Sequence, residues 1–555
     1  MIMKKIFLYA LTVVALFATS CQDMLKEEPY GKPTAEEMLS EPDNVAKVVG
    51  QAYADLKWLH DHWGYWGITT ISTDECINPK RGTDWDDNGY WVGLNDHSWT
   101  PNDLSFEYLW QFSNAGAVLC NKILNQLNSI QKDLPVEIYS RFTAELKVLR
   151  AYYYYTLFDA FGRIPYLEDY TAENVPQSDP WVVWNKLVTT LETEALNLPV
   201  IDSDNKVENY GRCSQGMAYT LLARLYLNAA SYGVTPANCG IKGITSETDF
   251  YNKCVETCQK VIDSKSYVIE NEFLANFKVN NENSNENIFV IVEDGNASID
   301  YRDHAGKMAN KLRIVFASLN YCHQEAYDLI EKPWNGFCCP PDFIALYEYG
   351  KDLRGPCDST LGTKDTINYG WFLGPIYHPT VKDSILRMDG DHGNLEAIIV
   401  NNVSSVSNAN HNEGARLLKY EVAKSGVNKY CDNDFVLLRY ADVLYMQYEA
   451  ALRAGNTKKT TELLADGEFQ KIRTRAGMPA YTSLDLDELL DERGREFAWE
   501  IVRRRDLIRY NKYSQGTWMF KEKGDKSRDW FPIPRKMIET SGGLWTQNEG
   551  YITDK

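Results

Sequence analysis

The sequence has no excess of basic residues. It carries 58 Lys and Arg against 77 Asp and Glu, a formal net charge of -19 at pH 7. Nucleic acids and anionic membrane surfaces attract clustered Lys and Arg. The one basic run, residues 503–505, lies among carboxylates and is typical of a salt-bridged helix face. The sequence therefore predicts that nucleic acid is not a partner.

Familiar catalytic motifs are also absent, including the P-loop, the G-x-S-x-G elbow, H-E-x-x-H and the Rossmann glycine pattern. Glu492 and Glu496 share a helix face, and two carboxylates on one face would suit acid–base hydrolysis of a glycoside. However, arginines are interleaved with them, and positive neighbours lower a carboxylate pKa, which is wrong for a general acid. We interpret these residues as structural ion pairs and expect no enzyme. An α-helical glycoside hydrolase is the remote alternative.

Metal-like CxxC spacing is missing, although the chain has 12 cysteines. Setting aside Cys21 leaves an odd number, which does not favour a disulfide framework, so we expect buried free thiols. His60 and His62 are too close in sequence to share a helix face as a metal pair. The stretch 389–396 resembles a calcium loop without its spacing. The sequence thus predicts no cofactor, with a structural calcium at 389–396 as the alternative.

Long apolar runs are confined to the N-terminus. Residues 6–17 are apolar, follow Lys4 and Lys5, and are too few to span a bilayer. Small residues then precede Cys21, so residues 1–20 are predicted to be a secretory signal peptide. The junction resembles a bacterial lipobox, with Ala18 where Leu is usual. We expect acylation of Cys21, the alternative being cleavage that leaves an unmodified cysteine.

Residues 21–42 then form a predicted lipidated tether, which is polar and contains three prolines. The acidic stretch directly after Cys21 resembles the surface-export signal of Bacteroidetes lipoproteins. This resemblance implies a lipid-anchored protein of the outer membrane, exposed at the cell surface.

Apolar residues at helical spacing dominate the remainder, so the predicted fold class is mostly α with minor β. Three helix pairs are expected, of the size found in tetratricopeptide-type solenoids: 105–131 with 137–160, 211–232 with 249–264, and 435–455 with 459–476. A further helix is predicted over 486–510, and short strands near 287–292 and 395–400. We expect one domain over 43–555, with a helical scaffold at about 43–265 and 431–515 and loop-rich portions at about 60–104 and 265–430.

Aromatic residues make up 13% of the chain, and the segment 58–101 is dense in tryptophan and acidic residues. A sugar ring has an apolar C–H face and a rim of hydroxyls, so its recognition needs flat aromatic platforms beside carboxylates, amides or arginines. The alternative for each tryptophan is packing over helix ends. The candidate ligand-binding residues here are Trp63, Trp66, Asp74, Arg81, Asp84, Trp85 and Trp91. Trp85 and Trp91 are the predicted platform, at which alanine should weaken glycan binding without loss of stability.

Several ordered motifs resemble one family. The run LRAYYYYTLFDAFGRIP begins at Leu149, and LLARLYL begins at Leu221. Together with segments 434–455, 469–477, 492–510 and 531–551, they resemble the SusD/RagB family of Bacteroidetes nutrient-uptake lipoproteins. The sequence departs from the family pattern at Ile501, where glycine is usual, and at Gln447, where alanine is usual.

The resemblance implies a helical, tetratricopeptide-containing fold and a SusC-like TonB-dependent transporter as partner, which the bound protein covers like a lid. It also implies that loops from the middle of the chain join the N-terminal loops at the ligand site, which adds Tyr301, Trp334 and Trp371 as candidates. The predicted function is capture of an oligosaccharide for that transporter. Peptide capture by the same architecture is the alternative.

Overall fold

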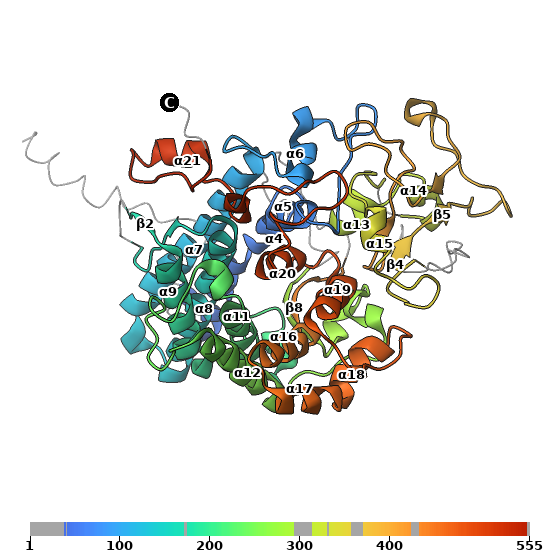
Figure 1. Cartoon of the computed structure of the whole chain (residues 1–555). Coiled ribbons are helices and arrows are strands. Elements are labelled where there is room, and N and C mark those ends of the chain that lie inside the picture. The colour runs from blue at the N-terminus through green and yellow to red at the C-terminus, as the bar shows by residue number, and fades with distance from the viewer. Residues whose placement is uncertain are drawn as a thin grey trace, which may run out of the picture.

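The computed structural model describes residues 38–39, 41–170, 175–293, 313–329, 332–356, 370–422 and 432–551. The predicted signal peptide, most of the tether and Tyr301 lie outside these ranges. The chain is mostly helical with a few short strands, as predicted (Figure 1). Within the described ranges, no helix combines the length and the apolar character that crossing a membrane requires.

Antiparallel helix pairs build one side of the molecule. The first pair is α7 (Leu104–Ser129) with α8 (Val136–Phe161), and the second is α11 (Gln215–Leu227) with α12 (Glu247–Asp263). Helix α9 (Pro180–Glu194) packs against α8 and α11. Ser214 caps α11, and Ser246 begins α12 with a capping box. These two pairs confirm the sequence prediction, and the figure shows them side by side (Figure 1).

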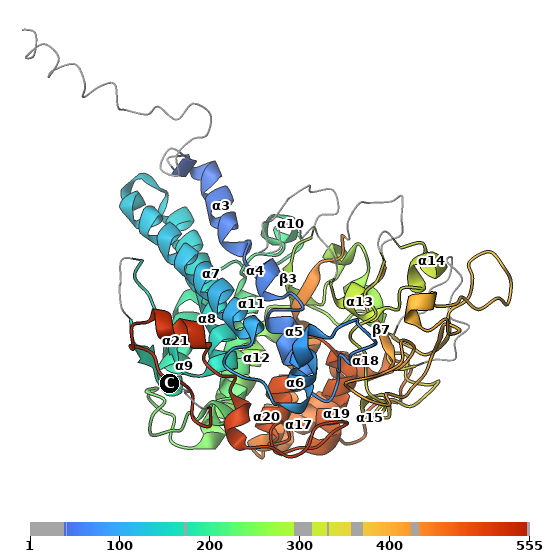
Figure 2. The ribbon, with the colours of Figure 1, turned by 90° about the horizontal axis from the view of Figure 1, so that it is seen from above.

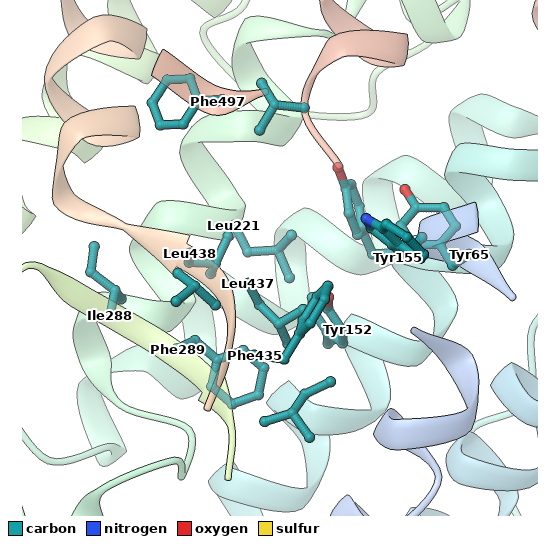
Figure 3. Close-up of a cluster of buried hydrophobic side chains, with 14 of the residues drawn as sticks. Tyr65, Tyr152, Tyr155, Leu221, Ile288, Phe289, Phe435, Leu437, Leu438 and Phe497 are labelled. Atoms are coloured by element: carbon teal, nitrogen blue, oxygen red, sulfur yellow. The ribbon is translucent and has the colours of Figure 1, made fainter. Parts of the chain in front are cut away.

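The third predicted pair begins differently from the expectation. Residues 435–439 form strand β8 (Phe435–Arg439), and helix α16 (Tyr440–Arg453) starts directly after it and packs on α12. The second helix of this predicted pair is broken into α17 (Thr457–Leu464) and α18 (Gly467–Thr474), because Asp466 caps a new helix. Strand β8 pairs antiparallel with β3 (Asn287–Ile291), which matches the strand predicted near 287–292. Both strands lie in the core beside α8 (Figure 3).

The predicted helix over 486–510 is two helices, α19 (Leu486–Phe497) and α20 (Arg503–Arg509). Between them, Trp499 and Ile501 have φ values of 62° and 65°. This left-handed conformation crowds a β-branched side chain and suits glycine, the residue usual in the resembled family at position 501. The break turns Trp499 inward, where its carbonyl accepts a hydrogen bond from Trp66 Nε1 at 3.0 Å.

The predicted ion pairs are confirmed at the centre of the scaffold. Glu496 is buried and pairs with Arg354, Arg439 and Arg475 at 2.7–3.0 Å. Glu492 pairs with Arg354, Arg473 and Arg495. These carboxylates are therefore occupied by arginines inside the protein.

The loop-rich portions fold beside the scaffold and carry short helices (Figure 2). Helix α3 (Pro42–Gly50) packs on α7 and α8, and α4 (Leu56–Leu59) packs on α7. The N-terminal loop-rich portion that follows contains α5 (Tyr65–Ile71) and α6 (Tyr90–Asp96). The middle portion contains α13 (Arg313–Ser318), α14 (His323–Tyr327) and α15 (Pro341–Ile344), together with strand pairs β4 (Gly370–Phe372) with β7 (Arg416–Leu418) and β5 (Gly374–Pro375) with β6 (Ile398–Ile399). The remaining elements are β1 (Ile164–Pro165), β2 (Gln177–Ser178), α10 (Lys206–Asn209) and α21 (Arg535–Thr540).

The cysteines follow the prediction wherever the structure describes them. Nine are free thiols; eight of these are buried and Cys322 is partly exposed. They pack as small apolar side chains.

Candidate functional site

Aromatic side chains from both loop-rich portions meet in one place. We call Trp63, Trp85, Tyr90, Trp91 and Trp334 the aromatic cluster. Trp91 lies at its centre, with ring centroids 4.7 Å from Trp63 and 5.3 Å from Trp85. Trp91 itself is fully buried, whereas the other four rings are each partly exposed. The cluster therefore has a buried base and a partly open rim.

Trp85 joins the two loop-rich portions. Its Nε1 donates a hydrogen bond to the Trp334 carbonyl oxygen at 2.9 Å. Its ring lies over Gly336, where an added Cβ would come within 2.4 Å of the ring, so glycine is required there. Trp85 has a φ of 58°, and the following turn is fastened by a bond from Trp91 Nε1 to Asp87 Oδ2 at 2.6 Å. Left-handed conformations at non-glycine residues are costly and are typical of functional loops.

Of the residues predicted to bind ligand, the structure thus brings Trp63, Trp85 and Trp334 together with part of each ring exposed. Asp84 precedes Trp85 and is also partly exposed. Tyr301 lies outside the described residues.

Four other predicted ligand contacts need correction, because their side chains are buried. Trp66 packs on Phe337, Trp371 packs on Trp499, and Trp91 is the base of the cluster. Each ring is covered by other rings and offers no face to a ligand in this conformation. These tryptophans support the site from beneath.

Arg81 is the fourth predicted ligand contact whose side chain is buried. Its buried guanidinium donates to the carbonyl oxygens of Asn335 at 2.9 Å, Gly336 at 2.7 Å and Glu413 at 3.0 Å. Arginine carries five donors in a fixed geometry, so one side chain fastens two chain segments beneath the cluster. Asp74 is partly exposed but is engaged by Arg503, with nitrogen–oxygen distances of 2.6 and 2.8 Å. Both residues therefore have structural partners.

The burial of Trp91 reverses the expected effect of its substitution. We predict that Trp91→Ala lowers the free energy of unfolding by about 3 kcal/mol, because it leaves a cavity beneath the cluster. Urea denaturation followed by circular dichroism measures this loss. The matched control is Trp181→Ala, since Trp181 is 39% exposed on α9 and should change stability little. An unchanged midpoint for Trp91→Ala would show that Trp91 is not part of the core.

A second group of side chains adjoins the cluster. The sequence analysis singled out Asp84 and the stretch 389–396, which contains His392, but did not bring them together with His411. Asp84 Oδ2 lies 3.3 Å from His392 Nε2 and 3.9 Å from His411 Nδ1. The Tyr321 hydroxyl lies 2.6 Å from His411 Nδ1. Burial and the neighbouring His392 together lower the pKa of His411 to about 4, although Asp84 opposes this effect. No local signal links these residues, since they come from distant parts of the chain.

Two buried carboxyl groups of the described residues, Glu75 and Asp434, have strongly raised pKa values and lie outside the aromatic cluster. Burial raises the pKa of Glu75 to about 8, and its Oε2 accepts a hydrogen bond from the Trp499 amide. Burial also raises the pKa of Asp434 to about 6, and this carboxylate accepts from the Tyr210 hydroxyl and the Glu293 amide. Each is a single carboxyl group held in the interior.

A cavity of about 830 Å³ lies between the end of α8 and the C-terminal segment, lined by residues that include Gly162, Arg163, Trp530 and Asn548. Its one tryptophan, Trp530, stacks on Tyr232, and Gly162 approaches its ring so closely that an added Cβ would lie at 3.0 Å. Because Trp530 is its one tryptophan, this cavity is a weaker sugar platform than the aromatic cluster, which has three partly exposed tryptophans.

Comparison with protein families gives two matches that together cover most of the chain. The model described as "SusD family" matches residues 285–551. The model described as "Starch-binding associating with outer membrane" matches residues 67–227. These two segments contain most of the scaffold helices, although not α12, and every residue of the aromatic cluster except Trp63.

Individual relatives agree with the family models. The starch-binding protein SusD of Bacteroides thetaiotaomicron is 24% identical over 511 residues, which is 87% of this chain and 84% of that protein. A SusD superfamily protein from Parabacteroides distasonis has a TM-score of 0.69 at 18% identity, covering 94% of this chain and all of its own. Surface glycan-binding protein A from B. thetaiotaomicron, solved with laminarihexaose, has a TM-score of 0.69 at 19% identity, covering 91% and 99%. At these identities the structural likeness establishes the fold.

Proposed function

The chain belongs to the SusD family, and on that basis we propose that it is a glycan-binding lipoprotein of the outer membrane. In this proposal, the aromatic cluster captures an oligosaccharide, and the protein delivers it to a SusC-like TonB-dependent transporter. The relatives are named as starch-binding and glycan-binding proteins, which supports binding rather than catalysis. A captured polar oligosaccharide cannot cross the bilayer by itself, so a channel partner is required.

The observation that carries the proposal is the fixed pair of partly exposed rings, Trp85 and Trp334. The hydrogen bond from Trp85 Nε1 holds the Trp85 ring against the Trp334 backbone, and the two ring centroids lie 6.5 Å apart with planes inclined by 47°. Inclined platforms suit a curved or twisted glycan chain, whose successive sugars present their C–H faces in different directions. The carboxylates of Asp84 and Asp86 flank Trp85 in sequence and offer acceptors for sugar hydroxyls.

We predict that Trp85→Ala and Trp334→Ala each weaken glycan binding about 2- to 12-fold, since one stacking contact contributes roughly 0.5–1.5 kcal/mol. Isothermal titration calorimetry with a panel that includes laminarihexaose and maltoheptaose measures the change. Trp181→Ala is again the matched control, because it removes an exposed tryptophan from α9 and should leave the affinity unchanged.

Unchanged affinity in both cluster variants would place the glycan site elsewhere. The same panel should include peptides, since binding of peptides alone would favour the peptide-capturing alternative. Analysis of the glycans after prolonged incubation tests the hydrolase alternative, and intact glycans are expected.

A further inference from the structure

Beside the aromatic cluster, three potential metal ligands converge from three chain segments. Asp84, His392 and His411 are the one group of three or more His, Cys, Asp or Glu side chains suited to a metal ion among the residues that the structure describes. We propose that they form a binding site for a divalent transition metal ion, with zinc as the best fit. This assignment concerns a group of residues distinct from the tryptophan platforms.

The spacing of the ligand atoms fits tetrahedral coordination. Zinc bonds of about 2.0–2.1 Å place neighbouring ligand atoms about 3.3 Å apart. Asp84 Oδ2 and His392 Nε2 are already 3.3 Å apart, and Asp84 Oδ2 lies 3.9 Å from His411 Nδ1. All three ligand atoms lie within 4.8 Å of one another. A shift of about 1 Å in the side chains would complete the geometry.

A second layer of contacts orients these ligands. The Asp389 carboxylate binds His392 Nδ1, which leaves His392 Nε2 directed at Asp84. A carboxylate behind a histidine is the arrangement that fixes the ring at many zinc sites. Asp84 is held by two reciprocal backbone hydrogen bonds with Arg81, at 2.9 and 3.0 Å. The carbonyl of His411 accepts hydrogen bonds from Asn335 and Arg416.

Tyr321 currently shares His411 Nδ1, at 2.6 Å from its hydroxyl oxygen. A metal ion would replace this hydroxyl as the partner of the nitrogen. The side chains of Asp84, His392 and His411 are 35%, 18% and 11% exposed, so the site is open to an ion from solvent and to a water molecule as fourth ligand.

The ligand types decide which metal fits. Two imidazoles and one carboxylate suit zinc and neighbouring transition metals, whereas calcium prefers six to eight oxygen ligands. The stretch 389–396, considered from sequence for calcium, contributes His392 to this group while Asp389 orients it. The geometry thus points to a different metal from the one that the acidic residues suggested.

The location suggests what the metal would do, and this step rests on the proposed function. Asp84 is the residue before Trp85, while His392 and His411 come from the loops on the other side of the group. A bound ion would therefore fasten the Trp85 turn to the middle loops. Because ordering a loop in advance removes part of the ordering cost of binding, zinc should raise glycan affinity several-fold.

The test begins with metal alone. The mature chain, freed of metal by a chelator, is titrated with zinc and separately with calcium in a calorimeter. We expect one zinc site per chain with a micromolar or tighter dissociation constant, at least tenfold weaker in Asp84→Asn, His392→Ala and His411→Ala, and no comparable calcium binding. The control is His378→Ala, another partly exposed histidine of the middle portion, which should bind zinc as the wild type does.

Absence of stoichiometric zinc binding, or equal zinc affinity in all three ligand variants, would overturn the site. Melting temperatures of the variants establish that each is folded, and His392→Ala removes a side chain that is outside the core. Glycan titration with and without zinc then tests whether zinc binding raises the glycan affinity. Zinc binding in a protein that binds no glycan would support the metal site and count against the proposed function, so the two failures are distinguishable.

Discussion

Replacing Glu496 with alanine is expected to lower the free energy of unfolding by about 5 kcal/mol, the upper end of the range for breaking a buried ion pair. Glu496 Oε1 lies 2.7 Å from both Arg439 Nη1 and Arg475 Nη2, and its Oε2 lies 3.0 Å from Arg354 Nη1. All four side chains are buried. Removal of the Glu496 carboxylate would leave three buried arginines with too few negative partners, in an interior where water cannot replace the lost carboxylate.

Urea denaturation compares this variant with Glu462→Ala. Glu462 is exposed and its two lysine partners lie 3.9 Å away, so its loss should change stability by less than about 0.5 kcal/mol. If Glu496→Ala unfolds with a midpoint close to that of the wild type, the network is not a principal source of stability. A variant too unstable to purify would agree with the prediction, provided that Glu462→Ala is recovered normally.

The same network predicts how stability depends on pH. Burial raises the pKa of Glu492, but the charges of Arg354, Arg495 and Arg473 outweigh this effect and lower the pKa to about 2. The unfolded value is about 4.3, so the ionised carboxylate stabilises the fold above that pH. This contribution is lost as the pH falls from about 4 towards 2, and the arginines of the network hold the pKa of Glu496 below its usual range in the same way. Unfolding by acid should therefore occur in that window.

Ion pairing by Glu492 and Glu496 could be predicted from sequence because arginines are interleaved with them. The partners of Glu496, which are Arg354, Arg439 and Arg475, come from other segments and could not be predicted. Glu492, Glu496 and Arg495 stand at helical spacing in one segment, and interleaved charges of opposite sign predict pairing. The long scaffold helices were predictable for the same reason, since their apolar residues recur at i, i+3 and i+4. The break at residues 498–502 was not predictable, because Ile501 favours regular structure locally and tertiary packing holds it at a φ of 65°.

The candidate site was predictable in its region and not in its details. Density of tryptophan marked the segment that contributes Trp85, but density does not say which ring faces solvent. Trp85 and Trp91 are six positions apart, but Trp85 is partly exposed whereas Trp91 is buried beneath its neighbours. Asp84 and His411 lie side by side because the fold brings together two loops that are distant in sequence, and no local pattern encodes that contact.

Replacing Cys21 with alanine is expected to move the protein from the membrane fraction to the soluble fraction almost completely. Cys21 lies outside the described residues, and its acylation is proposed from the signal peptide and the lipobox-like junction. Each buried methylene of an acyl chain contributes about 0.8 kcal/mol, so a doubly or triply acylated protein is stably anchored and an unacylated one is not. The net charge of -19 gives the protein no electrostatic attraction to an anionic membrane surface that could substitute for the anchor.

Loss of the anchor should also abolish most glycan uptake, because a soluble protein would diffuse away from the proposed transporter. The predicted tether of residues 21–42, at up to roughly 3.3 Å per extended residue, would let the body swing while its lipid stays in place. Cell fractionation, metabolic lipid labelling and uptake of labelled glycan measure the three effects. Cys322→Ala is the matched control, since Cys322 is a partly exposed thiol of the folded body and should remain in the membrane with normal labelling. A Cys21→Ala protein that still fractionates with the outer membrane and takes up lipid label would refute the anchor.

In mild detergent, the tagged wild-type protein should bring down one outer-membrane barrel near stoichiometrically. Normal uptake after deletion of the co-purifying barrel would refute the partnership, because delivery to that channel is the transport step that we propose for this protein.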